Sequence, residues 1–256
     1  MSSALLALLA LLTSPPLADA DAFTCLRESH PTVIDRLDGK ALVLVDDTRL
    51  VWDDGIAGKR GDVLLDGPDV NDIFTWRYAI GPGSTPPPRG EDPGRVRHRG
   101  LMDALYGKDA RAVQAALVEV AWMPKHGGRP VRFHRAHGAA AALARVSAEL
   151  DALPADLHRY VKITAGTFNW RPIAGTTRLS AHAHGVAIDV DVRHTDYWRW
   201  AVKREPDLPW RNRIPLAIVE VFERHGFVWG GKWHHYDTMH FEYRPELLHP
   251  RCVARR

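Results

Sequence analysis

Apolar residues recur at helical spacing in three segments of the second half of the chain. Residues 109–122 and 138–153 each place valine and leucine side chains on one face of a helix. Residues 214–225 do the same, with Pro215 suited to the first turn and Gly226 following as a stop signal. The pattern therefore predicts helices at these three places.

Alternating and short apolar runs predict strands between and after these helices. The first is residues 159–168, and short strands are expected around 227–229 and 239–243. The clearest alternation runs through 185–193, where one face carries Val186, Ile188, Val190 and Val192 and the other carries Ala187, Asp189, Asp191 and Arg193. Helices followed by strands in this order predict an α+β fold, with a central, mostly antiparallel sheet flanked by helices.

The first hundred residues show weaker periodicity. Residues 21–100 are rich in Asp, Gly and Pro, and the prolines and glycines of 81–95 oppose both helix and strand. We expect residues 21–100 to form a loop-rich N-terminal region that packs on a main domain at 101–256. The pattern assigns no role to this N-terminal region.

The start of the chain has the layout of a signal peptide. The apolar run at residues 4–12 is too short to span a membrane, and Ala18 to Ala20 resemble a small-residue cleavage site. No Lys or Arg precedes the run, which departs from the usual pattern. Residues 1–20 therefore predict an exported, periplasmic or extracellular protein cleaved after Ala20, with a buried N-terminal helix as the alternative.

Composition and charge narrow the range of partners. The 256 residues are 45% hydrophobic and 25% charged, which is typical of a globular protein without a membrane span. A formal net charge of +3, without a block of Lys or Arg, suits an anionic partner, and no motif indicates nucleic acid. Oligomeric state is not predicted by this pattern.

The chain has two cysteines, near the two ends of the predicted mature protein. In an oxidising compartment Cys25 and Cys252 could pair and tie the termini together. Two unrelated thiols are the alternative, and metal binding by two isolated cysteines is not expected.

Two segments carry candidate metal chemistry. The stretch SAHAHGVAIDVD at 180–191 contains His182 and Asp189, and the stretch WHHYDTMHFEY at 233–243 contains Asp237 and His240. Two imidazoles and a carboxylate suit zinc and leave one coordination position open. A further carboxylate that is not a ligand is what zinc-assisted hydrolysis needs as a proton acceptor.

The predicted strands can bring these residues together. Alternation places Asp189 away from the apolar face of its strand, and it places His240 opposite Met239 and Phe241. Two such strands side by side would present Asp189 and His240 on one face, with His182 supplied by the loop before the first strand.

Other readings of these residues remain open. His184 could replace His182, and Asp191 could support the site or pair with Arg193. Among the fourteen histidines, single ones are usually ordinary polar residues, and we expect surface positions for His134 and His137.

The two segments resemble the two metal motifs of one enzyme family. Ser180-x-His182-x-x-Gly185-x-Ala187-x-Asp189 and Trp229-Gly230-Gly231-x-Trp233-x-x-x-Asp237-x-x-His240-Phe241 resemble those of the D-alanyl-D-alanine carboxypeptidase/dipeptidase family of zinc peptidases. This family includes VanY-like and VanX-like enzymes and L-alanyl-D-glutamate endopeptidases, and it has a hedgehog-like fold. The resemblance covers about residues 140–247.

The resemblance implies a role for each matching residue. It implies zinc held by His182, Asp189 and His240, and Asp237 as general base, where many relatives have Glu. The segment GTFNWRPIAGTTRL at 166–179 resembles the loop that carries a catalytic arginine, so Arg171 is the expected oxyanion donor. Further roles are implied for Arg178 (the alternative arginine), Ser180 (support of a ligand), and Trp233 and His235 (lining of the cleft, or core).

The function implied is hydrolysis of an amide bond in the peptidoglycan stem peptide. The bond could be D-Ala-D-Ala, cut by a carboxypeptidase, or L-Ala-D-Glu, cut by an endopeptidase. A non-catalytic zinc-containing cell-wall-binding module on the same fold is the alternative, although such a module needs neither Asp237 nor Arg171.

Overall fold

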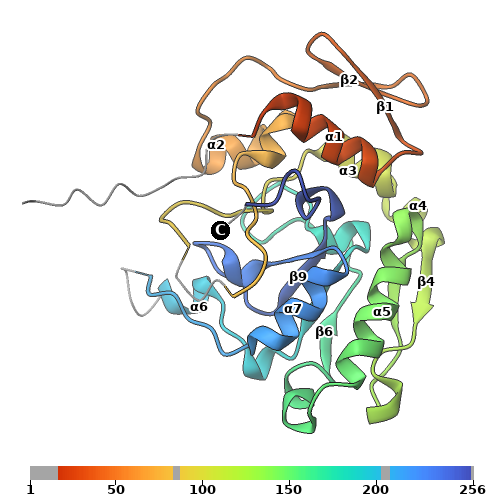
Figure 1. Ribbon diagram of the computed structural model, residues 1–256, viewed down its shortest axis with the longest axis vertical. Coiled ribbons are helices and arrows are strands. Elements are labelled where there is room, and N and C mark those ends of the chain that lie inside the picture. Colours follow the sequence, from red (N-terminus) through yellow and green to blue (C-terminus); the bar gives the residue numbers. More distant parts are fainter. Residues whose placement is uncertain (1–16, 83–86, 203–207, 255–256) are drawn as a thin grey trace, which may run out of the picture.

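A computed structural model (Figure 1) describes residues 17–82, 87–202 and 208–254. Most of the expected signal peptide, residues 1–16, lies outside this part. The first described helix, α1 (Asp19–Ser29), includes the expected cleavage position at Ala20.

The central sheet has four antiparallel strands in the order β6-β7-β9-β8. These are β6 (Thr164–Gly166), β7 (Ala187–Val190), β9 (His240–Tyr243) and β8 (Phe227–Trp229). The expected strands at 227–229 and 239–243 are confirmed. The expected α+β class with antiparallel pairing is confirmed as well.

Two expected helices pack beside this sheet. They are α5 (Ala139–Asp151) and α7 (Leu216–Arg224), which contact each other (Figure 1). From α7, Phe222 stacks on Phe241 of β9 with ring centroids 3.8 Å apart. Because both rings are fully buried, this contact fixes α7 against the strand that also carries His240.

The prediction of one helix over 109–122 is wrong in its second half. Helix α4 (Ala110–Ala116) ends where β4 (Leu117–Val120) begins, and β4 pairs antiparallel with β5 (Val131–His134). The apolar residues of this segment suit the periodicity of a helix as well as that of a strand. Pairing with a later strand decides for the strand.

Two expected strands are shorter than predicted. Residues 159–168 form strand only at β6, after a 3-10 turn at Ala155–Tyr160. The alternation of 185–193 holds through β7 and then ends, because Val192–His194 form another 3-10 turn. Val192 in that turn is 39% exposed and Asp191 just before it is buried, the reverse of the expected faces.

Residues 21–100 contain more regular structure than expected. A three-stranded sheet is formed by β1 (Ile34–Asp38), β2 (Ala41–Leu44) and β3 (Arg49–Val51). The helices here are α1, α2 (Gly61–Asp66) and the start of α3 (Arg99–Tyr106), most of which lies beyond residue 100. Figure 1 places these elements together above the main sheet.

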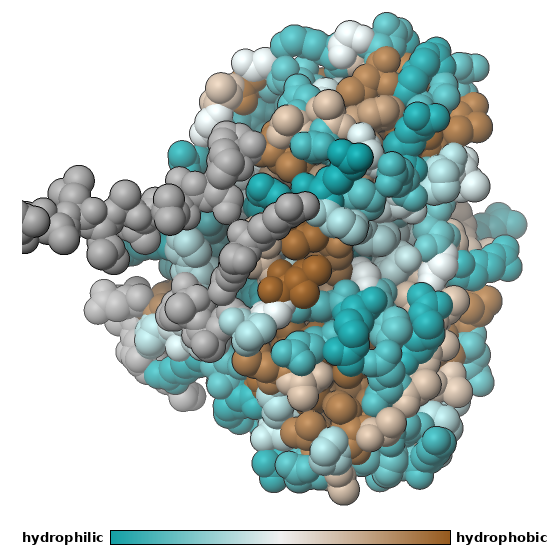
Figure 2. All heavy atoms as spheres, in the orientation of Figure 1, coloured by the Kyte–Doolittle hydropathy of each residue, from teal (hydrophilic) through white to brown (hydrophobic). Residues whose placement is uncertain are grey.

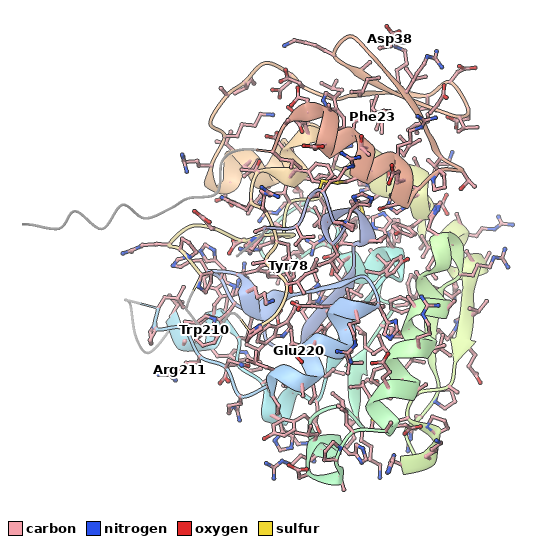
Figure 3. The ribbon with its side chains drawn as sticks, in the orientation of Figure 1. Phe23, Asp38, Tyr78, Trp210, Arg211 and Glu220 are labelled. Carbon is pink, nitrogen blue, oxygen red and sulfur yellow. A yellow bond between two sulfur atoms is a disulfide. The ribbon has the colours of Figure 1, made fainter. Side chains whose placement is uncertain are left out.

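A disulfide ties this region to the end of the chain. Cys25 and Cys252, for which the sequence left pairing and two separate thiols open, form a disulfide that joins α1 to the last described residues (Figure 3).

A buried polar cluster makes a second connection. The Tyr78 hydroxyl donates to Glu223 of α7 at 2.7 Å and accepts from the Trp229 backbone N–H at 2.9 Å. Lys232 also pairs with Glu223. Because these groups are buried and mutually satisfied, the N-terminal region and the main sheet form one packed body.

The remaining short helix is α6 (Trp198–Val202). On the face drawn in Figure 2, hydrophilic residues cover most of the surface, and hydrophobic residues gather in patches near its middle and lower part. Among the described residues, none of the helices has the length and apolar character needed to cross a bilayer.

Candidate metal centre

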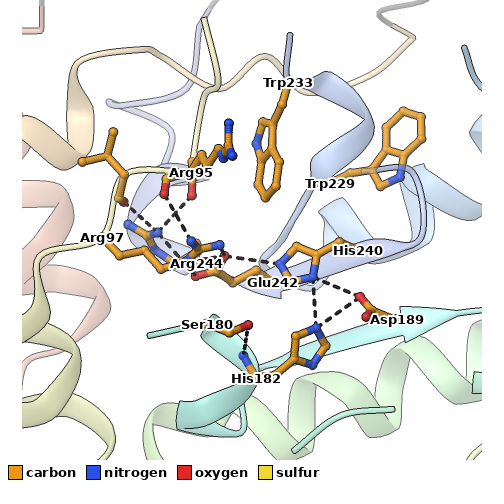
Figure 4. A network of polar contacts seen from close by, with 12 residues as sticks. Arg95, Arg97, Ser180, His182, Asp189, Trp229, Trp233, His240, Glu242 and Arg244 are labelled. Carbon is orange, nitrogen blue, oxygen red and sulfur yellow. Dashed lines mark hydrogen bonds and ion pairs between the residues drawn. The ribbon is translucent and has the colours of Figure 1, made fainter. Parts of the chain in front are cut away.

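Three of the sequence-predicted residues meet at one point of the central sheet. One side-chain ligand atom from each of His182, Asp189 and His240 lies within 4.8 Å of the other two. His182 Nε2 and His240 Nδ1 are 3.2 Å apart, and Asp189 Oδ1 lies 3.2 Å and 3.0 Å from these two atoms (Figure 4). The sequence-predicted trio is therefore assembled in the fold.

Strand register explains this convergence. Asp189 of β7 and His240 of β9 are direct cross-strand partners, so their side chains share one face of the sheet. His182 comes from the 3-10 turn Ala181–His184, which ends at Gly185. Gly185 has φ +67°, and a Cβ there would approach a Leu117 methyl to 2.5 Å, so a side chain is excluded by both conformation and space.

Hydrogen bonds to the backbone orient the His182 ring. Its Nδ1 lies 2.8 Å from the Thr167 carbonyl, so Nδ1–H donates there and Nε2 faces the other two residues of the trio. The backbone N–H of His182 donates to Ser180 Oγ at 3.3 Å. Backbone partners of this kind commonly fix the tautomer and orientation of metal-bound histidines. The donor set therefore fits zinc.

The charges of the trio depend on one another. Burial would raise the pKa of Asp189, but the facing His182 and His240 rings hold it well below its usual range. Burial would lower the pKa of His240, but Asp189 and Glu242 raise it to about 9. In the metal-free protein the trio thus holds a carboxylate and a protonated imidazole.

Asp237 lies beside the trio in an antiparallel bridge with Tyr197. Burial and the negative charge of Asp189 raise the pKa of its carboxyl well above the usual range. Its Oδ1 is enclosed and has no hydrogen-bond partner among the described residues. A carboxyl in this state can take up a proton near neutral pH.

Sequence reasoning missed Glu242, which is fully buried on the same strand as His240. Its Oε2 lies 3.6 Å from His240 Nε2, on the side of the ring away from Asp189. Arg97 and Arg244 hold its pKa far below the usual range despite burial. Alternation along 239–243 could have identified it, because His240 and Glu242 are two residues apart.

The two candidate arginines take different positions. Arg171 is exposed, and its guanidinium lies 3.4 Å from the Pro172 carbonyl. Arg178 pairs with Asp62 and Asp66 of α2, with the closer contact at 2.5 Å. The structure gives neither arginine a contact with the trio among the described residues.

Sequence reasoning also missed Arg95, which lies in the irregular segment 81–95. Arg95 pairs with buried Asp92 at 2.6 Å, and its charge is one of those that oppose the rise in the pKa of Asp237. No local sequence pattern indicates that Arg95 affects the pKa of Asp237, because the two residues are far apart in the sequence.

Most of the other candidates are part of the protein's framework. His184 contacts Asp103 at 3.1 Å instead of joining the trio. Asp191 pairs with Arg193, as one alternative proposed. The Trp233 indole is 4% exposed and donates to the Pro93 carbonyl at 2.7 Å, while His235 Nδ1 lies 2.9 Å from Asp92.

The expectation that His134 and His137 lie on the surface is wrong. His134 is 3% exposed, and its Nδ1 accepts from the Ala136 N–H at 3.1 Å. His137 is partly buried and contacts the Leu105 carbonyl at 3.0 Å. Packing of α3 and Tyr106 over this segment covers both rings.

A cavity of about 230 Å³ adjoins the histidine turn. His184, Leu179 and Asp66 of α2 are among the residues that line it. Four arginines also line it, and each is paired with a carboxylate: Arg95 with Asp92, Arg97 with Glu242, Arg99 with Asp103 and Arg178 with Asp66.

A second group of acids, Asp53, Asp54 and Asp69, is paired with lysines of the protein. Lys59 Nζ lies 2.5 Å from Asp54 and 3.2 Å from Asp69, and Lys40 Nζ lies 3.5 Å from Asp53. These ammonium groups supply positive charge to the acidic group.

Residues 174–243 match a family model described as D-alanyl-D-alanine carboxypeptidase. This span contains the trio and Asp237, and it excludes Arg97 and the rest of the N-terminal region. No curated protein and no solved structure matches the chain.

Proposed function

We propose that this chain, whose residues 174–243 match a family model described as D-alanyl-D-alanine carboxypeptidase, is a zinc-dependent peptidase that hydrolyses an amide bond of the peptidoglycan stem peptide. The observation that carries the proposal is the assembly of His182, Asp189 and His240 beside a carboxyl whose pKa is raised. Three ligands with a separate carboxyl are what a catalytic site needs, whereas a structural zinc site needs four ligands and no base.

Each residue has a distinct task in this proposal. His182 Nε2, His240 Nδ1 and Asp189 Oδ1 would hold the metal. A zinc ion held there would lower the pKa of its bound water to about 7 and polarise the substrate carbonyl. Asp237 accepts the proton of the attacking water and returns it to the leaving amine, for which its raised pKa suits it.

We propose Arg171 as the donor that steadies the developing oxyanion. The Arg171 carbonyl accepts from the Ser180 N–H at 3.1 Å, and Ser180 precedes the turn that carries His182. This backbone contact between the loop of Arg171 and the histidine turn supports the proposal. Loss of one oxyanion donor typically lowers the rate about 100- to 1000-fold.

The cavity next to the histidine turn supports a binding place for a peptide substrate. Arg95 and Arg178 line it together with His184, two residues after His182. Both arginines are already paired with carboxylates of the protein, so the cavity does not select between a terminal D-Ala-D-Ala and an internal L-Ala-D-Glu linkage.

We further propose that the chain is exported. The apolar run at 4–12 and the small residues before Ala20 support this, and the disulfide between Cys25 and Cys252 suits an oxidising compartment.

Digestion of defined muropeptides tests the activity. Pentapeptide and tetrapeptide muropeptides would be incubated with zinc-loaded protein and weighed by mass spectrometry, with chelator-treated protein as the control. A loss of one D-Ala identifies the carboxypeptidase, and separation after L-Ala identifies the endopeptidase. If neither bond is cut while zinc is bound at one equivalent, the protein is a zinc-containing binding module instead.

A further inference from the structure

The Glu242 carboxylate is a charge in the protein interior that needs an explanation. Its side chain is 0% exposed, on the strand that carries His240. An ionised carboxylate in such a place is costly unless it is paired and hydrogen-bonded.

Arg97 supplies that pairing from the N-terminal region. Its Nε lies 2.7 Å and 2.9 Å from the two Glu242 oxygens, and its Nη2 also contacts Oε2. Arg244 adds a more distant contact at 3.5 Å. The Arg97 guanidinium therefore holds the carboxylate as a planar fork, which fixes its orientation as well as its charge.

The carboxylate so fixed faces His240. Its Oε2 is 3.6 Å from Nε2, while Nδ1 on the other side of the ring points to His182 and Asp189 (Figure 4). His240 Nε2 is buried and has no hydrogen-bond partner within 3.5 Å among the described residues, and the Glu242 carboxylate faces it at 3.6 Å.

We propose that Glu242 and Arg97 are positioning residues of the metal centre: Arg97 fixes Glu242, and Glu242 keeps the His240 proton on Nε2 so that Nδ1 is available to the metal. The inference rests on the proposed zinc site. It assigns a task to the N-terminal region, because Arg97 lies outside residues 174–243.

The physical effect is on ligand basicity and orientation. A carboxylate that accepts from the distal nitrogen of a ligating imidazole makes the other nitrogen a better electron donor and holds the ring in place. Loss of such a partner commonly weakens metal binding about 10- to 100-fold. A purely structural ion pair would affect folding without changing zinc affinity.

Glu242→Gln tests the proposal, with Glu223→Gln as the matched control. Glu223 is an equally buried carboxylate that joins the N-terminal region to the main sheet through Tyr78 and Gly81, and it has no contact with the trio. Zinc affinity would be measured at pH 7.5 by competition with a chromophoric chelator, and unfolding of the metal-free proteins would be measured in urea.

We expect Glu242→Gln to bind zinc about 10- to 100-fold more weakly. Glu223→Gln should lose stability yet keep the wild-type zinc affinity within about threefold. Equal zinc affinity in Glu242→Gln and the wild type would overturn the inference, as would equal weakening in both variants. If the wild type itself binds no zinc, the proposed function fails at an earlier step.

Arg97→Lys keeps the test decisive if Glu242→Gln does not fold. Lysine preserves the positive charge and loses the fork, so zinc affinity should fall by a smaller factor, and the visible spectrum of the cobalt-loaded protein should change because His240 is held less firmly. An unchanged affinity together with an unchanged cobalt spectrum would contradict the inference.

Discussion

Removing the Tyr78 hydroxyl tests how much its buried hydrogen bonds contribute to packing of the N-terminal region on the main sheet. In Tyr78→Phe the ring remains, and two buried hydrogen bonds disappear. One is the donation to the Glu223 carboxylate at 2.7 Å, and the other is the acceptance from the Trp229 N–H at 2.9 Å. Glu223 retains Lys232 and the Gly81 N–H, whereas the Trp229 N–H loses the acceptor that the structure gives it.

The expected cost follows from these two losses. A hydrogen bond to a charged group contributes about 1.5–3 kcal/mol, and a buried N–H left without an acceptor costs about 1–3 kcal/mol. We therefore expect Tyr78→Phe to lower the free energy of unfolding by about 3–5 kcal/mol.

Urea unfolding under non-reducing conditions measures this effect. With a slope of about 3 kcal/mol per M, the midpoint should fall by at least about 1 M. The matched control is Tyr160→Phe, which removes only an exposed contact with Arg159 at 2.9 Å and should change stability by less than about 0.5 kcal/mol. A loss below about 1 kcal/mol in Tyr78→Phe would refute the reasoning.

Two other predictions concern the disulfide and the metal ligands. Replacing Cys25 and Cys252 by Ser removes a link between residues 227 positions apart, so stability should fall by about 3–5 kcal/mol in urea while zinc affinity stays unchanged; an unaltered unfolding midpoint would contradict this. Because the pKa of His240 is about 9 without metal, zinc must displace its proton at neutral pH. Calorimetry in two buffers of different ionisation enthalpy should show release of at least about one proton on zinc binding. Zinc affinity should fall about tenfold per pH unit from pH 8 to 6. A pH-independent affinity would contradict displacement of the His240 proton by zinc.

Asp189 and His240 were predictable from local information, whereas the choice of His182 over His184 rested on the resemblance to the family's first metal motif. Strict alternation around Asp189 and His240 assigns each residue to a strand face, and the register of β7 with β9 then brings them together. The same rule also reaches Glu242, two residues beyond His240. His182 required the glycine at 185, which allows the turn before the strand.

The errors arose where distant partners decide the local structure. Leu117–Val120 has apolar positions that suit a helix or a strand, and only the pairing with Val131–His134 makes it a strand. His134 is covered by α3, and no sequence pattern around His134 indicates this contact. The contact of Arg97 with Glu242 spans 145 positions, so neither residue's neighbours in the sequence reveal it.

The most direct test of the central claim is to measure zinc content and muropeptide hydrolysis together in Asp237→Ala. Asp237 is not among the three residues that meet at the proposed metal position, yet its raised pKa suits a proton acceptor. The variant should bind one equivalent of zinc with near wild-type affinity and lose hydrolysis by at least about 100-fold, whereas His240→Ala should lose both. Near-wild-type hydrolysis by zinc-loaded Asp237→Ala would contradict the account.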